Sequence, residues 1–293
     1  MSSLIRVWDR RLNEEIVEKV YGEGAVNFLY ESQIGRLLLW LFVSRKWISH
    51  LMGFYYSSGL SKSKIEPFIE NFDIAMADYE PVKYESFNNF FIRKFRPGVR
   101  NFEAEGLAGP CEARYFGYSQ TVSEFKFPVK SKYLTEAGLL GSVERAEPFV
   151  GGPLVIARLC PVDYHRYHYP IDGRTIEKYR VKGGYQSVNP VALRVFPDIF
   201  EKNIREVSIL DTEFGKIAFV EVGAAGVGKI VQSNFSSEFK RGDEKGYFLF
   251  GASTVVLLGE KGKWKVEKII EKNSEQGLET YIRLGEKIGE RPN

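Results

Sequence analysis

The sequence predicts an α+β fold, in which amphipathic N-terminal helices pack on a mostly β body. Up to about residue 78, apolar residues recur at spacings of three and four with few glycines between them, which is typical of helices. Beyond residue 107, short apolar runs alternate with Gly, Pro, Asp and Asn, which is typical of many short strands. A helical part followed by a strand-rich part indicates the α+β class.

The helical part is expected to extend over residues 13–78, with amphipathic segments at Gly35–Tyr56 and Lys62–Phe72. Ser61 precedes the second segment and is expected to cap it, because a serine oxygen can accept a hydrogen bond from the first helical turn. The first segment mixes large apolar residues with basic ones, which suits a membrane interface. The basic residues are Arg36, Arg45 and Lys46. Composition alone still favours packing on the protein's own core, as for most amphipathic helices.

The β body is expected to begin after Pro97-Gly98. This boundary divides the chain into a helical region, residues 1–98, which is the part that could associate with a membrane, and a β-rich domain, residues 99–293. The end of the chain, Gly277–Ile288, is expected to form a strand and a short helix. The clearest strands are predicted at Ile217–Val222, Gly246–Phe250 and Thr254–Leu258.

The composition excludes several classes of protein. The net charge of +3 is too small to indicate nucleic-acid binding, although a localised basic excess suits an anionic membrane. Two cysteines among 293 residues form no disulfide framework and fit a reducing compartment. The first residues are too polar for a signal peptide, and the longest apolar run, residues 37–43, is too short to span a bilayer. We therefore expect a cytosolic protein or one attached to a membrane surface.

His165 and His168 are two of only three histidines in the chain. A metal site would need further ligands such as Cys111 and Cys160, but no Cys-x-x-Cys or His-Glu-x-x-His arrangement supports one. A pair of hydrogen-bonded structural histidines is the commoner outcome for two histidines in general. The flanking tyrosines would restrict solvent and favour the neutral imidazole, which is the form able to act as a base.

Ser253 follows two small residues in the segment Gly251-Ala252-Ser253-Thr254. Small residues permit backbone geometry that bulkier ones resist, and a strained carbonyl beside a hydroxyl can undergo an N-to-O acyl shift. As a lone motif this is weak, because serines at the start of a strand are common. The segment also lacks the Gly-x-Ser-x-Gly pattern of α/β-hydrolases, which argues against an esterase.

Taken together and in order, these segments resemble the phosphatidylserine decarboxylase family of pyruvoyl-dependent enzymes. The similarity extends over nearly the whole chain, and several motifs in register are more specific than any one of them. The matching segments are residues 87–98, 160–168, 187–190, 203–206, 222–228, 240–248 and 250–256.

The resemblance implies that the chain cleaves itself and makes its own cofactor. Ser253 would attack the carbonyl of Ala252, and elimination and hydrolysis would leave a pyruvoyl group at position 253. The products would be a long chain, residues 1–252, and a short chain, residues 253–293, which remain together as a heterodimer. The pyruvoyl carbonyl would form a Schiff base with the amine of phosphatidylserine and accept electrons as carbon dioxide leaves, which yields phosphatidylethanolamine.

The resemblance also implies a role for each site residue. His168 would activate Ser253, His165 would serve the decarboxylation, and Glu112 would orient the activating histidine as the acid of a triad. Two of these positions differ from the family's usual pattern. The family usually has Asp where this chain has Glu112, and Gly where it has Ala252. Because small displacements in such a site are costly, both differences are expected to affect the rate of self-cleavage.

The implied partner is phosphatidylserine in an anionic membrane, with the protein bound peripherally on the cytoplasmic side of the cell membrane. Homodimer formation is left open. Arg166 and Lys130 are candidates for binding the lipid phosphate, because they are basic and lie near matching segments. Two other functions also remain open: a non-cleaving relative that binds lipid without catalysis, and a pyruvoyl decarboxylase of a soluble amino acid.

Overall fold

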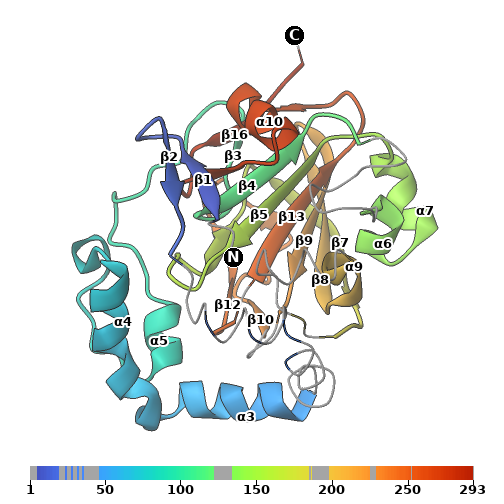
Figure 1. Ribbon diagram of the computed structural model, residues 1–293. Coiled ribbons are helices and arrows are strands. Elements are labelled where there is room, and N and C mark those ends of the chain that lie inside the picture. Colours follow the sequence, from blue (N-terminus) through green and yellow to red (C-terminus); the bar gives the residue numbers. More distant parts are fainter. Residues whose placement is uncertain are drawn as a thin grey trace.

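The predicted α+β class is confirmed by the computed structural model, in which one large sheet forms the centre of the molecule (Figure 1). The structure describes residues 5–19, 24, 28, 32, 35, 46–121, 134–184, 186, 198–224, 229–251 and 253–292. Within these residues the large sheet has ten strands. In order across the sheet they are β11 (Glu238–Phe239), β7 (Gly173–Val181), β8 (Arg205–Thr212), β9 (Gly215–Val222), β13 (Ser253–Gly259), β5 (Leu154–Leu159), β4 (Ala113–Tyr118), β15 (Glu279–Ile282), β1 (Arg6–Asp9) and β2 (Glu14–Val17).

Each face of the large sheet covers its own apolar core, because side chains alternate along a strand. On β13, Val256 and Leu258 point into the first core, whereas Val255 and Leu257 point into the second. Three short helices cover the first core, α6 (Glu136–Leu140), α7 (Val143–Ala146) and α9 (Ile199–Lys202). The second core lies against helix α10 (Lys268–Glu275) and a second sheet of β10 (Ile230–Gln232), β12 (Glu244–Phe248) and β6 (Arg166–His168).

This alternation determines which way the predicted nucleophile points. Ser253 lies two residues before Val255 on β13, so its side chain shares the face that packs against the second sheet. His168 is the last residue of β6 in that second sheet. The serine and the histidine segment therefore belong to the two layers that enclose the second core.

A third, smaller sheet lies beside the C-terminal strands. It consists of β14 (Lys265–Val266), β16 (Lys287–Glu290) and β3 (Leu107–Ala108). The predicted strand and short helix at Gly277–Ile288 is therefore wrong in part, because this segment contains strand β15 and the start of β16, and the helix α10 precedes it. The tight turn at Gly285, with φ +87°, separates the two strands.

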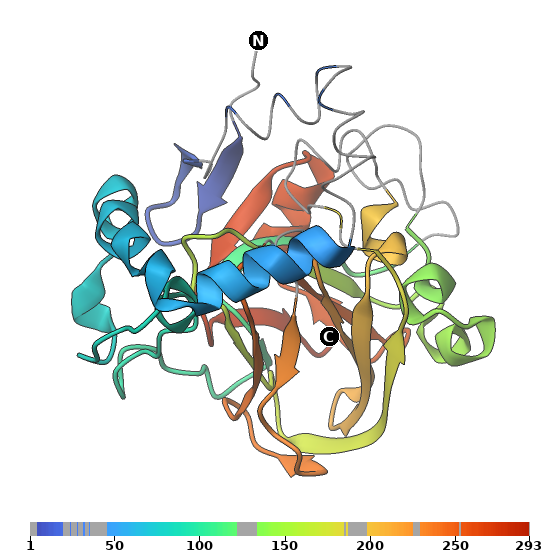
Figure 2. The same cartoon turned by 90° about the horizontal axis from the view of Figure 1, so that it is seen from below.

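The N-terminal helices lie below and to the left of the strands in Figure 1, and the longest of them crosses in front of the strands in Figure 2. A cluster of aromatic and aliphatic side chains holds them together, with Phe68, Phe87 and Phe90 at its centre. The helices are α3 (Lys46–Ser57), η2 (Gly59–Lys64), α4 (Ile65–Phe72), η3 (Met76–Asp78) and α5 (Phe87–Phe91). No helix among the described residues is long and apolar enough to cross a membrane.

Two expectations for the N-terminal part are corrected. The helical prediction for residues 13–78 is wrong at Glu14–Val17, which form a strand that pairs with β1. Only Ile16 of this strand is half-buried, so the strand depends on its backbone pairing with β1 and not on an apolar face. Ser61 does not cap α4. It lies inside η2, donates to the carbonyl of Ser58 at 2.7 Å and accepts from the backbone N–H of Phe87 at 2.9 Å. The remaining described part of the Gly35–Tyr56 segment is helical, as predicted.

Candidate active site

Ser253 is the first residue of β13 and is 1% exposed. It lies opposite Leu159 on β5 in an antiparallel pair. Among the described residues its hydroxyl oxygen has no hydrogen-bond partner, which is unusual because buried polar groups are nearly always bonded. Gly251, two residues earlier, has φ +148°, a conformation that other residues rarely adopt. Ala252 lies outside the described residues.

The strand entry is tied to the N-terminal helices by Phe250. Its backbone N–H donates to the side-chain oxygen of Asn88 on α5 at 2.9 Å. Its ring packs against Tyr56 of α3 and Phe91 of α5, with ring centroids 4.2 and 5.1 Å away. Phe91 in turn lies 3.8 Å from the ring of His165. Phe91 thus contacts both Phe250, which precedes Ser253 in the chain, and His165.

His165 is fully buried, and its two ring nitrogens differ. Nδ1 lies 3.0 Å from the backbone oxygen of Asp163. Because a carbonyl oxygen can only accept, Nδ1 must carry the proton and Nε2 must hold the lone pair. That Nε2 atom is buried with no partner among the described residues. Burial lowers the pKa of His165 to about 3, although the bond to Asp163 opposes the shift. The ring is therefore neutral at physiological pH.

His168 repeats this arrangement three residues later, at the end of β6. Its Nδ1 lies 2.9 Å from the backbone oxygen of Gly242, so Nδ1 again carries the proton. Nε2 is buried and unpartnered among the residues that the structure describes. Burial lowers the pKa of His168, against the opposing effect of its bond to Gly242. Both histidines are thus neutral rings that present a free Nε2 lone pair, the state required of a general base.

Glu112 is brought close to His168 in the chain fold but is bonded elsewhere. The backbone N–H of His168 donates to the carbonyl of Pro110 at 2.8 Å, two residues from the glutamate. The carboxylate of Glu112 accepts from Arg100 at 2.7 and 3.0 Å and from the Tyr281 hydroxyl at 2.9 Å. In the described structure the orienting acceptor of His168 is therefore the Gly242 carbonyl.

A buried ion network next to Ser253 was not foreseen from the sequence. Arg158 on β5 lies opposite Thr254 and binds the carboxylates of Glu18 and Glu279. Arg114, its cross-strand neighbour on β4, binds Glu18 and Asp163. Arginines inside the apolar runs of two strands were a visible signal. Their partners were not, because Glu18, Asp163 and Glu279 lie between 49 and 140 residues away from these arginines in sequence.

A second buried pair lies between the two sheets. The ammonium of Lys245 contacts the carboxylate of Glu221, and both side chains are fully buried. Lys245 occupies a β-bulge between Glu244, which pairs with His168, and Gly246, which pairs with Tyr167. The bulge turns Lys245 inward, because the extra residue reverses the local alternation of side chains.

The predicted phosphate ligands are not placed as free cations. Arg166 is bonded through its guanidinium to both carboxylate oxygens of Glu244, at 2.9 and 2.8 Å, and to the carbonyl of Ile92. Lys130 lies outside the described residues. Cys160 accepts from Arg158 at 2.9 Å, and Cys111 lies 3.7 Å from the Tyr115 hydroxyl. Within the described residues no group of His, Cys, Asp or Glu could hold a metal ion.

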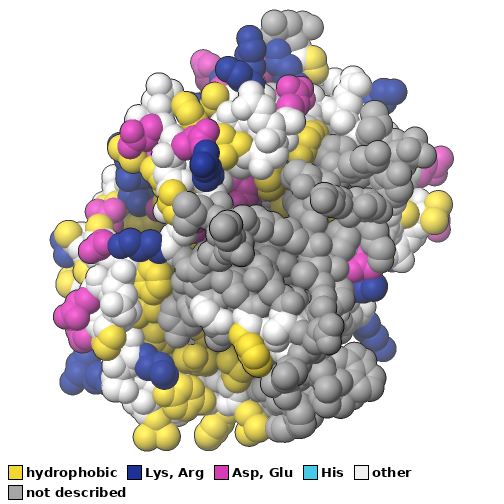
Figure 3. Space-filling model, viewed as in Figure 1, with side chains coloured by type: hydrophobic (Ala, Val, Ile, Leu, Met, Phe, Trp, Pro, Cys, Tyr) yellow, Lys and Arg dark blue, Asp and Glu magenta, His cyan; other side chains and the backbone are white. Residues whose placement is uncertain are grey.

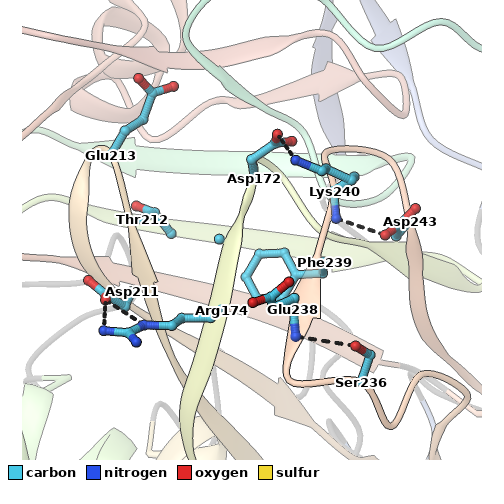
Figure 4. A pocket seen from close by; sticks show the side chains of 11 residues that line it. Asp172, Arg174, Asp211, Thr212, Glu213, Ser236, Glu238, Phe239, Lys240 and Asp243 are labelled. Carbon is cyan, nitrogen blue, oxygen red and sulfur yellow. Dashed lines mark hydrogen bonds and ion pairs between the residues drawn. The ribbon is translucent and has the colours of Figure 1, made fainter.

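A large groove on the surface lies away from these residues. It has a volume of about 740 Å³ and lies along β7 and β11 (Figure 4). Its acidic side chains are partly neutralised, since Asp172 pairs with Lys240 and Asp211 with Arg174. None of the site residues predicted from the sequence lines it, so its size does not identify it as a reaction site.

The chain was compared with known proteins. A family model described as phosphatidylserine decarboxylase matches residues 87–290. A phosphatidylserine decarboxylase proenzyme of Fusobacterium nucleatum is 40% identical, with 99% of this chain and 98% of that protein covered. Proenzymes of the same name from Ruminiclostridium cellulolyticum and Clostridium novyi are each 38% identical to this chain. The matches cover 98% of this chain in both cases, and 97% and 99% of those two proteins.

Proposed function

Because this chain belongs to the phosphatidylserine decarboxylase family, we propose that it is a proenzyme that cleaves itself before Ser253 and then converts phosphatidylserine to phosphatidylethanolamine and carbon dioxide. The observation that carries the proposal is the state of three buried atoms. Ser253 Oγ, His165 Nε2 and His168 Nε2 are all buried and without a partner among the described residues. A nucleophile and two bases kept unpaired at a cost in stability support a chemical rather than a structural role.

The chain's own residues can carry out the maturation. His168 Nε2 accepts the proton of the Ser253 hydroxyl as the oxygen attacks the carbonyl carbon of Ala252. The acyl group moves from nitrogen to oxygen, and the amine of residue 253 takes up the proton. Elimination across the Cα–Cβ bond of residue 253 then releases residues 1–252 as a carboxylate. Hydrolysis of the remaining unsaturated amine releases ammonia and leaves the pyruvoyl group.

The pyruvoyl group supplies an electron sink for loss of carbon dioxide from the serine headgroup of the lipid. The unpaired, buried Ser253 side chain at the start of β13 fits its origin there. His165 exchanges a proton through Nε2 during that step, since its ring is neutral and that nitrogen is free. Glu112 is the acid of the maturation site in this proposal. Its carboxylate orients His168 after the carboxylate has left Arg100.

The N-terminal region, residues 1–98, is the membrane-associating part in this proposal, and residues 99–293 are the catalytic body. Large apolar side chains are exposed on the outer surface of α3 and η2, at Leu51, Phe54 and Leu60, with 59%, 79% and 78% of their area accessible. Hydrophobic side chains gather at this end of the molecule in Figure 3. Lys62 and Lys64 follow them in η2. Apolar anchors beside lysines suit peripheral binding to an anionic bilayer on the cytoplasmic side.

Intact-mass analysis tests the maturation. The purified protein is expected to separate into a chain ending at Ala252 and a shorter, pyruvoyl-blocked chain beginning at position 253. Ser253→Ala is expected to leave a single chain. Thr254→Val is the matched control, because Thr254 is also buried and unpartnered, and it is expected to cleave normally. A wild-type protein that stays whole at 33.5 kDa, with no fragments after hydroxylamine treatment, would point to a non-cleaving lipid-binding protein.

Carbon dioxide release tests the substrate. We expect release from vesicles that contain phosphatidylserine and none from free serine or other soluble amino acids. Release only from free amino acids would contradict the lipid assignment and would support a decarboxylase of a soluble amino acid. The Ser253→Ala variant should be inactive on both, which excludes a contaminating activity.

A further inference from the structure

The tautomer of His165 depends on the position of one backbone oxygen. The Nδ1 atom lies 3.0 Å from the carbonyl of Asp163, which fixes the proton on that nitrogen. If this oxygen moved away, the proton would be free to occupy Nε2 instead, and the nitrogen that exchanges a proton in the proposed function would lose its lone pair. Whatever holds the carbonyl of Asp163 therefore controls which nitrogen of His165 can exchange a proton.

The carbonyl of Asp163 is held from outside by Arg93. The guanidinium of Arg93 donates to this oxygen at 3.2 Å and to the carbonyl of Val162 at 2.7 Å. Arg93 is 1% exposed, and its guanidinium lies 4.5 Å from the ring centroid of Tyr79 and 4.8 Å from that of Phe90. A planar fork packed between two rings has little freedom, so it restrains both carbonyls.

The side chain of Asp163 fixes the same turn from inside. Its carboxylate accepts from the backbone N–H of Cys160 at 2.6 Å and forms an ion pair with Arg114 of β4. The backbone N–H of Asp163 returns a hydrogen bond to the carbonyl of Cys160 at 2.9 Å. These bonds close the turn Cys160–Asp163, which leaves β5 directly after Leu159, the residue opposite Ser253.

We propose that Asp163 is a positioning residue for the decarboxylation step. By closing the turn after β5 it presents its own carbonyl to His165 Nδ1, and so keeps Nε2 as the nitrogen that exchanges the proton. The role in catalysis rests on the proposed function, whereas the tautomer is a property of the folded chain. His168 is held instead by the carbonyl of Gly242, so self-cleavage is expected to proceed without the charge of Asp163.

The first measurement needs no variant of Asp163. Nitrogen-15 spectra of the histidine-labelled mature protein distinguish a ring protonated at Nδ1 from one protonated at Nε2. The chain has three histidines, and the signals of His165 are identified by their loss in His165→Gln. A proton on Nδ1 in the wild type supports the proposal. A proton on Nε2 overturns it, whether or not any variant folds and whether or not the protein is a decarboxylase.

The second measurement uses Asp163→Asn, which keeps the shape of the side chain but removes the charge that Arg114 binds. We expect a cleaved protein whose kcat for carbon dioxide release falls on the order of 10- to 100-fold, the range that applies when a group orienting a metal-binding histidine is removed. The KM for phosphatidylserine should stay within about twofold, because a substrate-binding group is not removed. The signals of His165 should shift toward the Nε2-protonated form.

The matched control is Asp211→Asn, which removes an equivalent carboxylate from the exposed ion pair with Arg174 and should change neither kcat nor the spectrum. Unchanged kcat and an unchanged tautomer in Asp163→Asn overturn the proposal. The proposal is also overturned if Asp163→Asn slows cleavage, lowers kcat and raises KM together while the tautomer is retained, since that pattern indicates a structural role alone. A wild-type protein that does not cleave or release carbon dioxide contradicts the proposed function, while the tautomer still decides the positioning.

Discussion

At the scale of single residues, the site is defined by hydrogen bonds that are made and by others that are left unmade. Both histidines give Nδ1 to a backbone carbonyl, and both keep a buried Nε2 atom without a described partner. A carbonyl acceptor imposes the tautomer as firmly as a carboxylate does, but it adds no negative charge. The rings therefore stay neutral when buried, and Nε2 remains available as a base.

The two histidines are expected to separate into two functions when each is replaced. His168→Asn should slow self-cleavage on the order of 10²- to 10⁴-fold, the usual contribution of a general base. His165→Asn should cleave normally but release little carbon dioxide. Intact mass against time gives the first rate, and carbon dioxide release from phosphatidylserine vesicles gives the second. Equal effects of both variants on cleavage would contradict this division of roles.

The rate of self-cleavage is expected to fall only at a pH below the value at which an exposed histidine takes up its proton. The reacting form of His168 is neutral, and its pKa is lowered by burial from the usual 6.5. The neutral form therefore persists as pH falls through 6.5, and the cleavage rate should decline only at more acidic pH. The stability of the folded chain depends on the same histidines but responds at higher pH than the cleavage rate does. The unfolded chain binds protons at its histidines first, so the free energy of unfolding should begin to fall below about pH 6.5.

A rate profile measured on freshly made proenzyme and urea unfolding of the uncleaved Ser253→Ala variant separate these two effects. A cleavage rate that halves near pH 6.5 would indicate that the base is solvated in the reacting state.

Glu112→Asp is expected to speed cleavage by about tenfold, since small displacements strongly affect such sites. The glutamate is held by both arms of Arg100 and by the Tyr281 hydroxyl. An aspartate is one methylene shorter, so it should lose the two-armed contact with Arg100 and become free to reach His168. The cleaved fraction against time measures the effect. Slower cleavage would indicate that Arg100 and Glu112 act together as a fixed structural pair.

At the scale of elements, the N-terminal helices and the strands of the β body are joined through aromatic contacts around Phe250. Tyr56 at the end of α3 lies against Phe250, just before β13, and α5 holds the backbone of Phe250 through Asn88. The face of α3 that is turned away from this contact exposes Leu51 and Phe54. The helix thus has an inner side fixed to the strand entry and an outer side available to a membrane.

The outer side of α3 is expected to determine membrane binding. Leu51→Ser together with Phe54→Ser removes two large apolar anchors, each worth about 1.5–3 kcal/mol if fully buried in lipid, so affinity for anionic vesicles should fall at least about tenfold. Vesicle sedimentation measures the change, and intact mass serves as the control for folding, because cleavage should be unaffected. Unchanged sedimentation would place the membrane contact elsewhere.

At the scale of the whole molecule, ion pairs between distant segments hold the edge of the large sheet. Arg158 on β5 reaches Glu18, which follows β2, and Glu279 on β15. Burial raises the pKa of Glu18, but Arg158 and Arg114 outweigh it and lower the pKa to about 2. The carboxylate is therefore charged at neutral pH, and the network links the N-terminal strands, the central strands and the C-terminal strand β15.

Arg158→Met is expected to lower the free energy of unfolding by about 3–5 kcal/mol, because it removes the arginine that binds the buried Glu279 and leaves Glu18 with Arg114 alone. Arg174→Met is the matched control, since Arg174 pairs with Asp211 at the surface, and it should cost about 1 kcal/mol or less. Urea unfolding of both variants in the Ser253→Ala background, where the chain stays whole, makes the comparison. Equal losses would show that the buried network adds little to stability.

The sequence by itself determined the fold class, the three clearest strands of the β body, the family and, through the family, the residues expected to react. These follow from local order along the chain: apolar periodicity, turn residues, and motifs such as the two histidines and the Ser253 segment. Local order could not reveal that residues 14–17 form a strand, because that strand exists only through its partner β1.

Only the tertiary structure decided which atoms meet. In the folded chain Glu112 binds Arg100 and Tyr281, and His168 Nδ1 bonds to the carbonyl of Gly242. Arg166 forms an ion pair with Glu244. The fold also buried Arg158 and Glu18, 140 residues apart, against each other. The physical reason is that hydrogen bonds and ion pairs depend on distances of about 3 Å and on exclusion of water. Both are set by how the layers pack, and the order of residues along the chain does not specify either one.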